Sequence, residues 1–161
     1  CKKFLNNMKK INSNLFKLAM STYATGITII TINKNKNFIG KTVNSFASLS
    51  LDPPLVLFSL DKNSSSLKDF KKVSFLGINI LSKNQKKISN HFSLKQPHWN
   101  DTPYFLSSNN IPLIKNSMAN IDCKIIKLIK QGDHIIFICQ INTLVVDKKK
   151  KPLIYFNSKY M

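Results

Sequence analysis

The sequence has no arginine and no glutamate, so its charge comes from 25 lysines and 7 aspartates. Arginine is the usual residue for bidentate recognition of bases and phosphates, and its absence argues against a dedicated nucleic-acid-binding face. The aspartates are isolated, which gives little support for catalysis by paired carboxylates. Lysine, asparagine, isoleucine and serine are abundant along the whole chain, which indicates a codon bias rather than selection for one basic surface.

Glycine is also scarce, with 4 residues in the chain, and none of them forms a glycine-rich Rossmann or P-loop nucleotide motif. A nucleophilic triad is poorly supported, because no serine lies in a G-x-S-x-G turn and no cysteine lies beside an electropositive helix start. If the chain is an enzyme, we therefore expect a bound cofactor to carry the chemistry while protein groups position it.

The three cysteines, Cys1, Cys123 and Cys139, are odd in number and form no C-x-x-C pair. A disulfide framework or a metal site is therefore not indicated, and a reducing, cytoplasmic compartment fits best. Cys123 and Cys139 lie in apolar strand patterns, where we expect small buried thiols.

Long hydrophobic runs are absent, since no apolar segment approaches the roughly 20 residues that cross a bilayer, and no membrane span is expected. Residues 1–12 form a lysine-bearing N-terminal extension without the apolar core of a signal peptide. The 161 residues, 43% of them hydrophobic, are expected to form one domain, 1–161, with its core at residues 15–160.

Positive charge is what the chain has in excess, with a formal net charge of +18. A field of this sign attracts phosphate-bearing nucleotides and raises their rate of encounter. It would equally support salt-dependent binding of nucleic acid. The charge therefore indicates an anionic ligand without identifying it.

Strand patterns dominate the predicted secondary structure, and they do not alternate with helices as in a doubly wound sheet. Strands are predicted at residues 25–32, 38–43, 55–60, 74–81, 121–129, 134–146 and 153–156. Short helices are predicted at residues 13–23, capped by Ser13, and at 67–71 and 84–92, and the apolar face of the first is expected to pack on the core. This order predicts a mainly antiparallel β-barrel with a few short peripheral helices.

Three irregular features interrupt these strands. Turns are predicted at residues 33–37 and 131–133, each joining two arms of a hairpin. The alternation of apolar residues slips at Ile125-Ile126, which predicts a bulge. Residues 93–112 are the least regular part, either a lid over an active site or a long surface excursion.

Residues 40–60 combine a strand, a hydroxyl-rich run and a rigid corner. Asn44, Ser45, Ser48 and Ser50 supply the polar side chains, and Asp52-Pro53-Pro54 ends the run. Consecutive prolines have no N–H for a sheet ladder and have a fixed φ, so this is a stiff connection between two strands. Such a connection offers donors to an anion, although by composition alone a solvated loop is the favoured interpretation.

Two further segments are candidates for a polar site. Ser64, Ser65 and Ser66 precede the helix at residues 67–71, where free N–H groups can bind an anion. The alternative is that these serines only cap the helix. His134 follows Gly132-Asp133 at a hairpin end, where it is either a functional imidazole or a turn residue.

The order of these motifs closely resembles the flavin reductase-like family, whose members are small split β-barrels that bind FMN or FAD. The residues that carry the resemblance are Gly40-x-Thr42-x-Asn44-Ser45-Phe46-x-Ser48-x-Ser50-x-Asp52-Pro53-Pro54-Leu55, Ala24-Thr25-Gly26-Ile27-Thr28-Ile29, Asn63-Ser64-Ser65-Ser66, Asn79-Ile80-Leu81, Gly132-Asp133-His134 and Pro152-Leu153-x-Tyr155-Phe156. The resemblance implies a mainly β, Greek-key-like antiparallel split barrel.

The resemblance also implies a set of site residues. It places four residues along the isoalloxazine ring, namely Thr42, Asn44, Ser45 and Phe46. Three more would face the polar edge of the ring and the ribityl chain, namely Ser48, Ser50 and Leu51. The phosphate would be bound by Ser64, Ser65 and Ser66, and Asn79 is implied as a further cofactor-binding residue. His134 is implied as the catalytic residue, near the flavin and nicotinamide rings and at the opposite end of the flavin from the serines. A basic residue often accompanies the phosphate in the family, and here Lys62 or Lys68 is available.

The function that the resemblance implies is an NAD(P)H:flavin oxidoreductase. It would transfer hydride from NAD(P)H to FMN or FAD and supply reduced flavin to a partner monooxygenase or another acceptor, as a homodimer. One alternative is a non-catalytic FMN-binding protein on the same barrel. A second alternative, from a different class, is a basic nucleic-acid-binding β-barrel.

Overall fold

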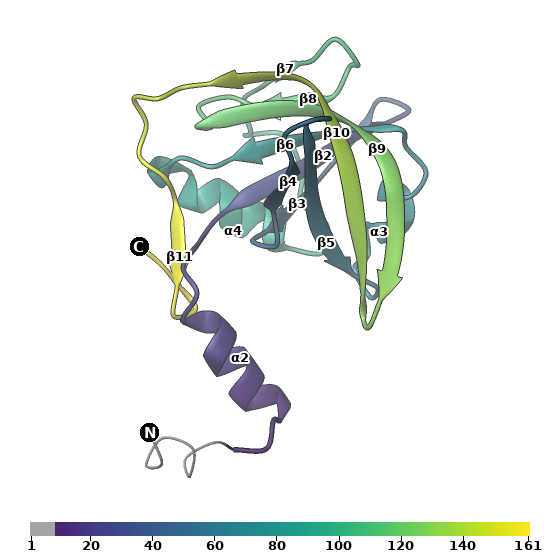
Figure 1. Ribbon diagram of the computed structural model, residues 1–161. Helices are drawn as coiled ribbons and strands as arrows, with labels where there is room; N and C mark the ends of the chain where they lie inside the picture. The colour runs from purple at the N-terminus through teal and green to yellow at the C-terminus, as the bar shows by residue number, and fades with distance from the viewer. Residues whose placement is uncertain (1–8) are drawn as a thin grey trace.

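The computed structural model describes residues 9–161, so Cys1 and most of the N-terminal extension lie outside the described residues. The elements in chain order are α2 (Ser13–Ser21), β1 (Thr25–Gly26), β2 (Thr28–Lys34), β3 (Asn37–Val43), β4 (Ala47–Ser50), β5 (Leu55–Asp61), α3 (Leu67–Phe70), β6 (Phe75–Ile80), the 3-10 helix η1 (Lys83–Gln85), α4 (Lys86–Ser93), β7 (Tyr104–Leu106), β8 (Pro112–Ile114), β9 (Ala119–Gln131), β10 (His134–Val146), β11 (Ile154–Phe156) and β12 (Lys159–Tyr160). Figure 1 shows their arrangement.

A strongly curved seven-stranded sheet, in the order β3-β2-β6-β9-β10-β5-β4, forms the body of the molecule (Figure 1). Every pair of neighbouring strands in this sheet is antiparallel. The strands β1, β11 and β12 form a small second sheet, and β7 and β8 form a third. The prediction of a mainly antiparallel β fold with few short helices is confirmed.

The core follows from the alternation of side chains along the strands. In β5 and in the first half of β10 every second residue is buried, and the rings of Phe58 and Phe137 stack with their centroids 4.8 Å apart. Phe70 of α3 closes this cluster with its ring edge toward Phe137. A second cluster includes Phe92 of α4 and Leu153 of the C-terminal segment. Since side chains in a strand alternate between faces, the other half of β5 and β10 is left for the outer surface.

The irregular features of the strands lie where the sequence predicts them. Asn35 and Lys36 have φ of 52° and 69° in the β2–β3 turn, and Gly132 has φ of 55° in the β9–β10 turn. Ile138 pairs with Lys127 while its neighbour pairs with Ile125, which leaves one extra residue in β9. The two hairpin turns and the bulge are therefore confirmed.

The segment between α4 and β8 is a packed excursion with short strands of its own. The ring of Trp99 packs edge-on against Phe38, Phe92 and Tyr104, with centroids 5.8, 4.9 and 5.6 Å away. Strands β7 and β8 form a hairpin after it. These contacts favour the surface excursion over a lid that is free to move.

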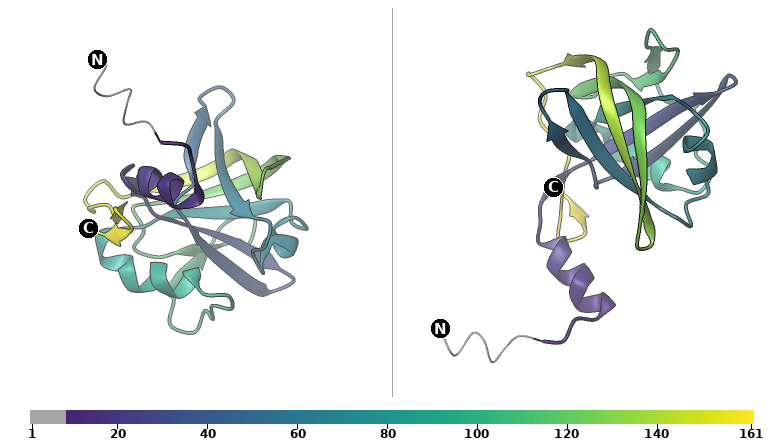
Figure 2. Two further views of the ribbon diagram at one scale, coloured as in Figure 1. Left: turned by 90° about the horizontal axis from the view of Figure 1, so that it is seen from below. Right: turned by 45° about the vertical axis from the view of Figure 1, so that its right-hand side comes forward.

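The first helix differs from the prediction. Asn12, not Ser13, caps it, since the Asn12 side chain accepts a hydrogen bond of 2.8 Å from the N–H of Leu15. None of its residues is buried, and Leu18 remains 65% exposed. The expected packing of its apolar face on the core is therefore wrong, because the helix projects away from the barrel (Figures 1 and 2).

Two other boundaries differ. The strand predicted at residues 25–32 is divided into β1 and β2, which belong to different sheets. The hydroxyl-rich run includes the edge strand β4, which pairs with β5 on the far side of the proline corner. Within residues 9–161, no helix has both the length and the apolar character needed to cross a membrane.

Candidate functional site

A cavity of about 360 Å³ opens beside the end of β3. Thr42 and Asn44 line it together with residues of α4 and of the C-terminal segment. The hydroxyl of Thr42 donates a 2.7 Å hydrogen bond to the carbonyl of Ser89 in α4, which fixes β3 against that helix. The amide of Asn44, in contrast, is exposed and is free to bind a ligand.

The other wall of this cavity is formed by residues that were not assigned a role from the sequence. Tyr155, Ser158 and Tyr160 line it, and the hydroxyls of Tyr160 and Ser89 lie 2.9 Å apart. The motif around Tyr155 carries part of the family resemblance, and it was the signal in the sequence that could have indicated this wall of the cavity. Its spacing alone does not indicate that the C-terminal tyrosines return to the end of β3, because that depends on the pairing of β11 with β1.

Ser45 holds the chain between β3 and β4 onto β5. Its hydroxyl donates to the carbonyl of Ser59 at 2.9 Å and accepts from the N–H of the same residue at 3.0 Å. Its proton is therefore not available to a ligand. Phe46 packs against the main core. These two side chains position Asn44 and the start of β4.

The remaining residues of this run lie on the edge of the sheet. Ser48 is exposed on β4, and Ser50 donates to the carbonyl of Asp52 at 3.2 Å. Leu51 is 92% exposed at the corner. An edge strand leaves backbone N–H and C=O groups unpaired on one side, so β4 offers these groups to a ligand or a partner.

The three serines before α3 have different hydrogen-bonding roles. Ser66 is the N-cap residue but makes no side-chain cap hydrogen bond, and its hydroxyl lies 3.2 Å from that of Ser64. Ser65 donates to the carbonyl of Lys95 at 3.0 Å, which ties the segment to the chain after α4. The hydroxyls of Ser64 and Ser66 are therefore the ones with capacity for a ligand.

His134 begins β10, directly opposite Asp61 at the end of β5. Its Nδ1 lies 2.7 Å from the carboxylate of Asp133, which accepts there, so Nε2 remains free. Hydrogen bonding and attraction from His134, with lesser help from the Asp133 backbone and Lys62, lower the pKa of Asp133. The imidazole is 42% exposed and can be reached by a ligand.

The position of His134 relative to the serines differs from the expectation. Lys62 donates through its backbone N–H to the carbonyl of Asp133 at 2.9 Å, and the N–H of Ser64 donates to the carbonyl of Asp61. The serine segment and the histidine therefore lie at the same end of β5, not at opposite ends of the candidate site. The register of β5 with β10 brings them together, and no sequence motif encodes that register.

Asn79 lies in the core, unlike the other candidate residues. It is fully buried, and its amide donates to the carbonyl of Ile29 and accepts from the N–H of Ile114 and the side chain of Asn120, at 2.9, 2.7 and 2.8 Å. A second donation reaches Thr31 at 3.3 Å. The hydrogen-bonding groups of Asn79 are used inside the core, and this burial argues against the prediction that its side chain binds the cofactor.

The lysines near these groups differ in whether their ammonium groups already have a hydrogen-bond or ion-pair partner. Lys62 donates through its ammonium to the carbonyl of Gly132. Lys68, in the only turn of α3, is exposed and has no ion-pair partner among the described residues. Lys41 donates to the carbonyl of Ser93 at 3.0 Å, and burial lowers its pKa. Lys68 is thus the freer of the two lysines considered for the phosphate.

The fold brings the remaining candidates together along β5. Ser45 pairs through its hydroxyl with Ser59 on one side of β5, and His134 pairs with Asp61 on the other side. Two strand spacings and two residues separate Ser45 from His134, a span of about 12 Å. This outer strip, with a cavity at one end and free hydroxyls at the other, fits a planar ring system with an anionic tail.

Comparisons with known proteins agree with this geometry. The model of the flavin reductase like domain matches residues 20–161. The FMN reductase (NADH) SmoA of Agrobacterium fabrum is 35% identical over 130 residues, 81% of this chain and 75% of that protein. The reductase subunit HsaB of a flavin-dependent monooxygenase from Rhodococcus jostii is 30% identical over 93% of this chain and 77% of its own length.

A solved structure also resembles the whole molecule. The flavin reductase PheA2 in its native state superposes with a TM-score of 0.87 at 33% identity, covering 94% of this chain and 97% of that one. Because the match covers 94% of this chain, the resemblance is not confined to one motif. The chain therefore belongs to the flavin reductase-like domain family, as its motifs predict.

Proposed function

We propose that this protein is a flavin reductase that uses NADH or NADPH to reduce FMN or FAD. The arrangement along β5, with Ser45 on one side and His134 on the other, is the observation that carries the proposal. A relative that is 30% identical over 93% of this chain and 89% of its own length, StyB of Pseudomonas fluorescens, is named as an NADH-dependent flavin reductase. The flavin, when bound, supplies the acceptor for hydride, and the protein supplies binding and orientation.

Each part of the strip has a role in this proposal. Thr42 and Asn44 hold the ring at the cavity end, while Ser45 and Phe46 keep their loop on β5 and on the core. Along the ribityl chain and the polar edge lie Ser48, Ser50 and Leu51 of the sheet edge. The phosphate is bound by Ser64 and Ser66, with Ser65 fixing their segment. Free hydroxyls and an exposed amide are the donors that such a ligand needs.

His134 is the proposed catalytic residue. Asp133 holds its Nδ1, as carboxylates commonly do for functional imidazoles, and this leaves Nε2 pointing away from the pair. In that arrangement Nε2 is left to contact and orient the nicotinamide of NAD(P)H, which would approach from the serine end of the strip. Its partial exposure allows contact with a ligand without opening the barrel.

The decisive experiment follows the absorption spectrum of the purified protein with and without FMN, and then adds NADH without oxygen. Binding followed by bleaching of the flavin band supports the reductase. Binding without bleaching would instead support the non-catalytic FMN-binding protein. Salt-dependent retention on DNA with no change in the flavin spectrum would favour the nucleic-acid-binding alternative.

The acceptor of the reduced flavin in our proposal is a partner monooxygenase. HsaB, which aligns over most of this chain, is named as the reductase subunit of such an enzyme. A coupled assay in which the protein and NADH support a flavin-dependent monooxygenase through free FMN would test the transfer. Failure of that assay with a reductase that reduces FMN normally would restrict the proposal to reduction alone.

We further propose that the protein is a homodimer. The projecting helix α2 exposes Phe16, Leu18 and Met20, and the end of β10 exposes Leu144 and Val145. Apolar side chains in such number are normally covered by another surface. Light scattering across a range of concentrations should give twice the mass of the chain, and a monomer throughout would contradict the proposal.

A further inference from the structure

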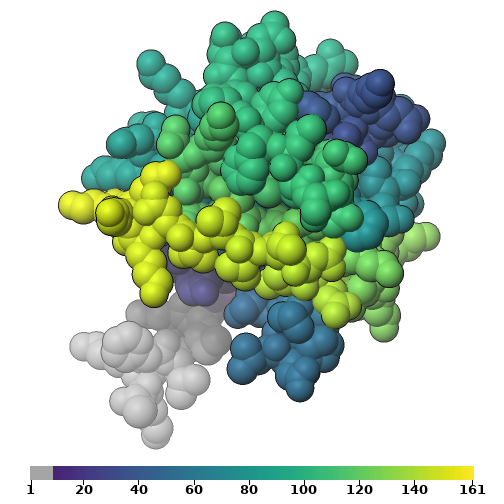
Figure 3. Space-filling view, turned by 90° about the horizontal axis from the view of Figure 1, so that it is seen from above, coloured from purple at the N-terminus to yellow at the C-terminus, as the bar shows by residue number. Residues whose placement is uncertain are grey.

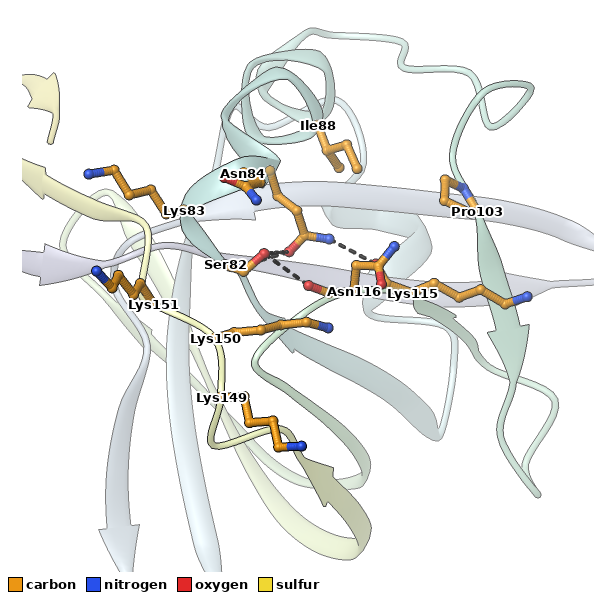
Figure 4. Close-up of a pocket in the computed structure, with 11 residues that line it drawn as sticks. Ser82, Lys83, Asn84, Ile88, Pro103, Lys115, Asn116, Lys149, Lys150 and Lys151 are labelled. Carbon is orange, nitrogen blue, oxygen red and sulfur yellow. Dashed lines mark hydrogen bonds between the residues drawn. The ribbon is translucent and has the colours of Figure 1, made fainter.

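A second and larger cavity, of about 540 Å³, lies apart from the strip along β5. Its walls come from the start of the η1–α4 unit, Pro103, the turn after β8, and the turn between β10 and β11 (Figure 4). In Figure 3 the C-terminal segment runs across the surface as a band beside the segment that precedes β8. None of the residues proposed for flavin binding lines this cavity.

Lysine is strongly concentrated in this cavity. Five of its 11 lining residues are lysines, against 25 in the 161 residues of the chain, so the overall abundance of lysine does not account for the cluster. The lysines are Lys83, Lys115, Lys149, Lys150 and Lys151. No aspartate lines the cavity, and Asp147 beside it pairs with Lys150 at 3.2 Å.

The backbone that carries these lysines is held in place. The N–H of Lys83 donates to the carbonyl of Lys151 at 2.8 Å, and Ser82 forms a β-bridge with Pro152. At the floor, the buried side chain of Gln85 donates to the carbonyl of Lys115 at 2.9 Å. The positions of the lysines are therefore built into the tertiary structure, while their ammonium groups extend from it (Figure 4).

The charges in the cavity are largely uncompensated. Among the described residues, Lys83, Lys115, Lys149 and Lys151 have no ion-pair partner. Figure 4 shows the side chains of Lys115, Lys149 and Lys150 extending in a common direction, while those of Lys83 and Lys151 extend the opposite way. Like charges held close together repel one another, and a multivalent anion placed between them relieves this repulsion.

We propose that this cavity binds a small molecule that carries at least two linked phosphate groups. Several lysines around one opening bind multiple phosphates as point charges and do not need the bidentate geometry of arginine. The volume lies within the range of small-molecule sites. Ile88 and Pro103 form an apolar wall, and Asn84 and Asn116 add amide groups, so a nucleoside diphosphate fits the same chemistry.

Titration calorimetry with inorganic pyrophosphate and with ADP, at about 0.15 M salt to screen diffuse attraction, tests the proposal. The pocket variant is Lys115→Gln/Lys149→Gln, and the matched control is Lys124→Gln/Lys127→Gln, which removes the same charge from exposed positions on β9. We expect affinity to fall by roughly tenfold or more in the pocket variant and by less than about twofold in the control. If ADP binds more tightly than pyrophosphate, the apolar wall formed by Ile88 and Pro103 also contributes to binding.

Three outcomes would overturn the proposal. The first is no heat with either ligand, and the second is an equal loss of affinity in the two variants, which would indicate diffuse attraction to the basic surface. The third is displacement of bound FMN by pyrophosphate, which would place the anion in the flavin site. FMN binding by each variant is measured separately, through the quenching of flavin fluorescence. The test of the lysine cavity therefore does not depend on the proposed reductase activity.

Discussion

Ser45 and Ser59 are joined by two hydrogen bonds through one hydroxyl, which donates to the carbonyl of Ser59 at 2.9 Å and accepts from its N–H at 3.0 Å. The chain between β3 and β4 is thereby fastened to β5, two residues before β5 reaches Asp61 and its partner His134. A structural anchor and a candidate catalytic residue thus share one strand.

Replacing this anchor tests its role. Ser45→Ala should lower the free energy of unfolding by about 1–2 kcal/mol, because the N–H of Ser59 loses its partner in a half-buried place. Urea unfolding measures the loss, and Ser74→Ala, at an exposed serine, is the control. We also expect weaker quenching of FMN fluorescence, since Asn44 and Phe46 lose their fixed position. Unchanged FMN affinity would remove this loop from the site.

The phosphate assignment is tested by comparing FMN with riboflavin. Ser65→Ala/Ser66→Ala should weaken FMN binding by about 1–3 kcal/mol, because a hydrogen-bonding hydroxyl and the tie to Lys95 are lost. Riboflavin lacks the phosphate and should be affected much less. Calorimetry with both ligands measures the difference, and an equal loss for the two would show that the serines do not bind the phosphate.

Substitution of His134 should affect the rate of flavin reduction and not the affinity for flavin. We expect His134→Ala to keep FMN affinity nearly intact while slowing reduction by NADH roughly tenfold or more. Asp133→Asn keeps the imidazole but weakens the group that orients it, so an intermediate rate is expected. Stopped-flow absorbance of the flavin band gives the rates. Reduction of the His134→Ala variant at the wild-type rate would make His134 a turn residue only.

Asn79 should matter for stability and not for the ligand. Asn79→Ala removes hydrogen bonds to Ile29, Ile114 and Asn120 inside the core, and we expect a loss of about 2–4 kcal/mol in the free energy of unfolding. Asn84→Ala, at an exposed side chain, is the control and should change stability little. A folded Asn79→Ala protein with much weaker FMN binding would restore Asn79 to the site.

The two buried thiols should make the fold sensitive to alkali. Burial raises the pKa of Cys139 from 9.0 to about 12, and it raises the pKa of Cys123 further. The unfolded chain therefore loses these protons at a lower pH than the folded one, so stability is retained below about pH 9 and lost as the pH rises toward 12. The denaturant concentration at the midpoint of unfolding should fall as the pH is raised from 8 to 11. In the Cys123→Ser/Cys139→Ala variant this midpoint should depend less on pH.

Local features of the molecule were determined by the sequence alone. The hairpin turns at Asn35 and Gly132 and the bulge beside Ile125 follow from short-range backbone preferences and from the alternation of apolar residues. The family motifs are equally local, because each lies within one segment of the chain. Together they were enough to predict a mainly antiparallel β fold and a flavin-related function.

Relationships between distant segments were decided by the tertiary structure. Asn79 lies in a recognisable motif, yet the packing of β6 between β2 and β9 buries it completely. His134 and Ser64 lie at the same end of β5 through the register of β10 with β5, and Tyr160 reaches the end of β3 through the pairing of β1 with β11. Strand order and register depend on how all the apolar faces are buried at once, and no single segment specifies them.

The cavity lined by five lysines shows most clearly which features the sequence determines and which the tertiary structure decides. The run Lys148 to Lys151 is visible in the sequence as a charged turn, and Lys83 and Lys115 are two ordinary lysines among 25. The hydrogen bond between Lys83 and Lys151, the bridge of Ser82 with Pro152 and the contact of Gln85 with Lys115 bring the segments that carry these lysines around one cavity. Composition determined that the protein is basic, while the fold decided where that charge is concentrated, because Coulomb energy depends on distances that only packing sets.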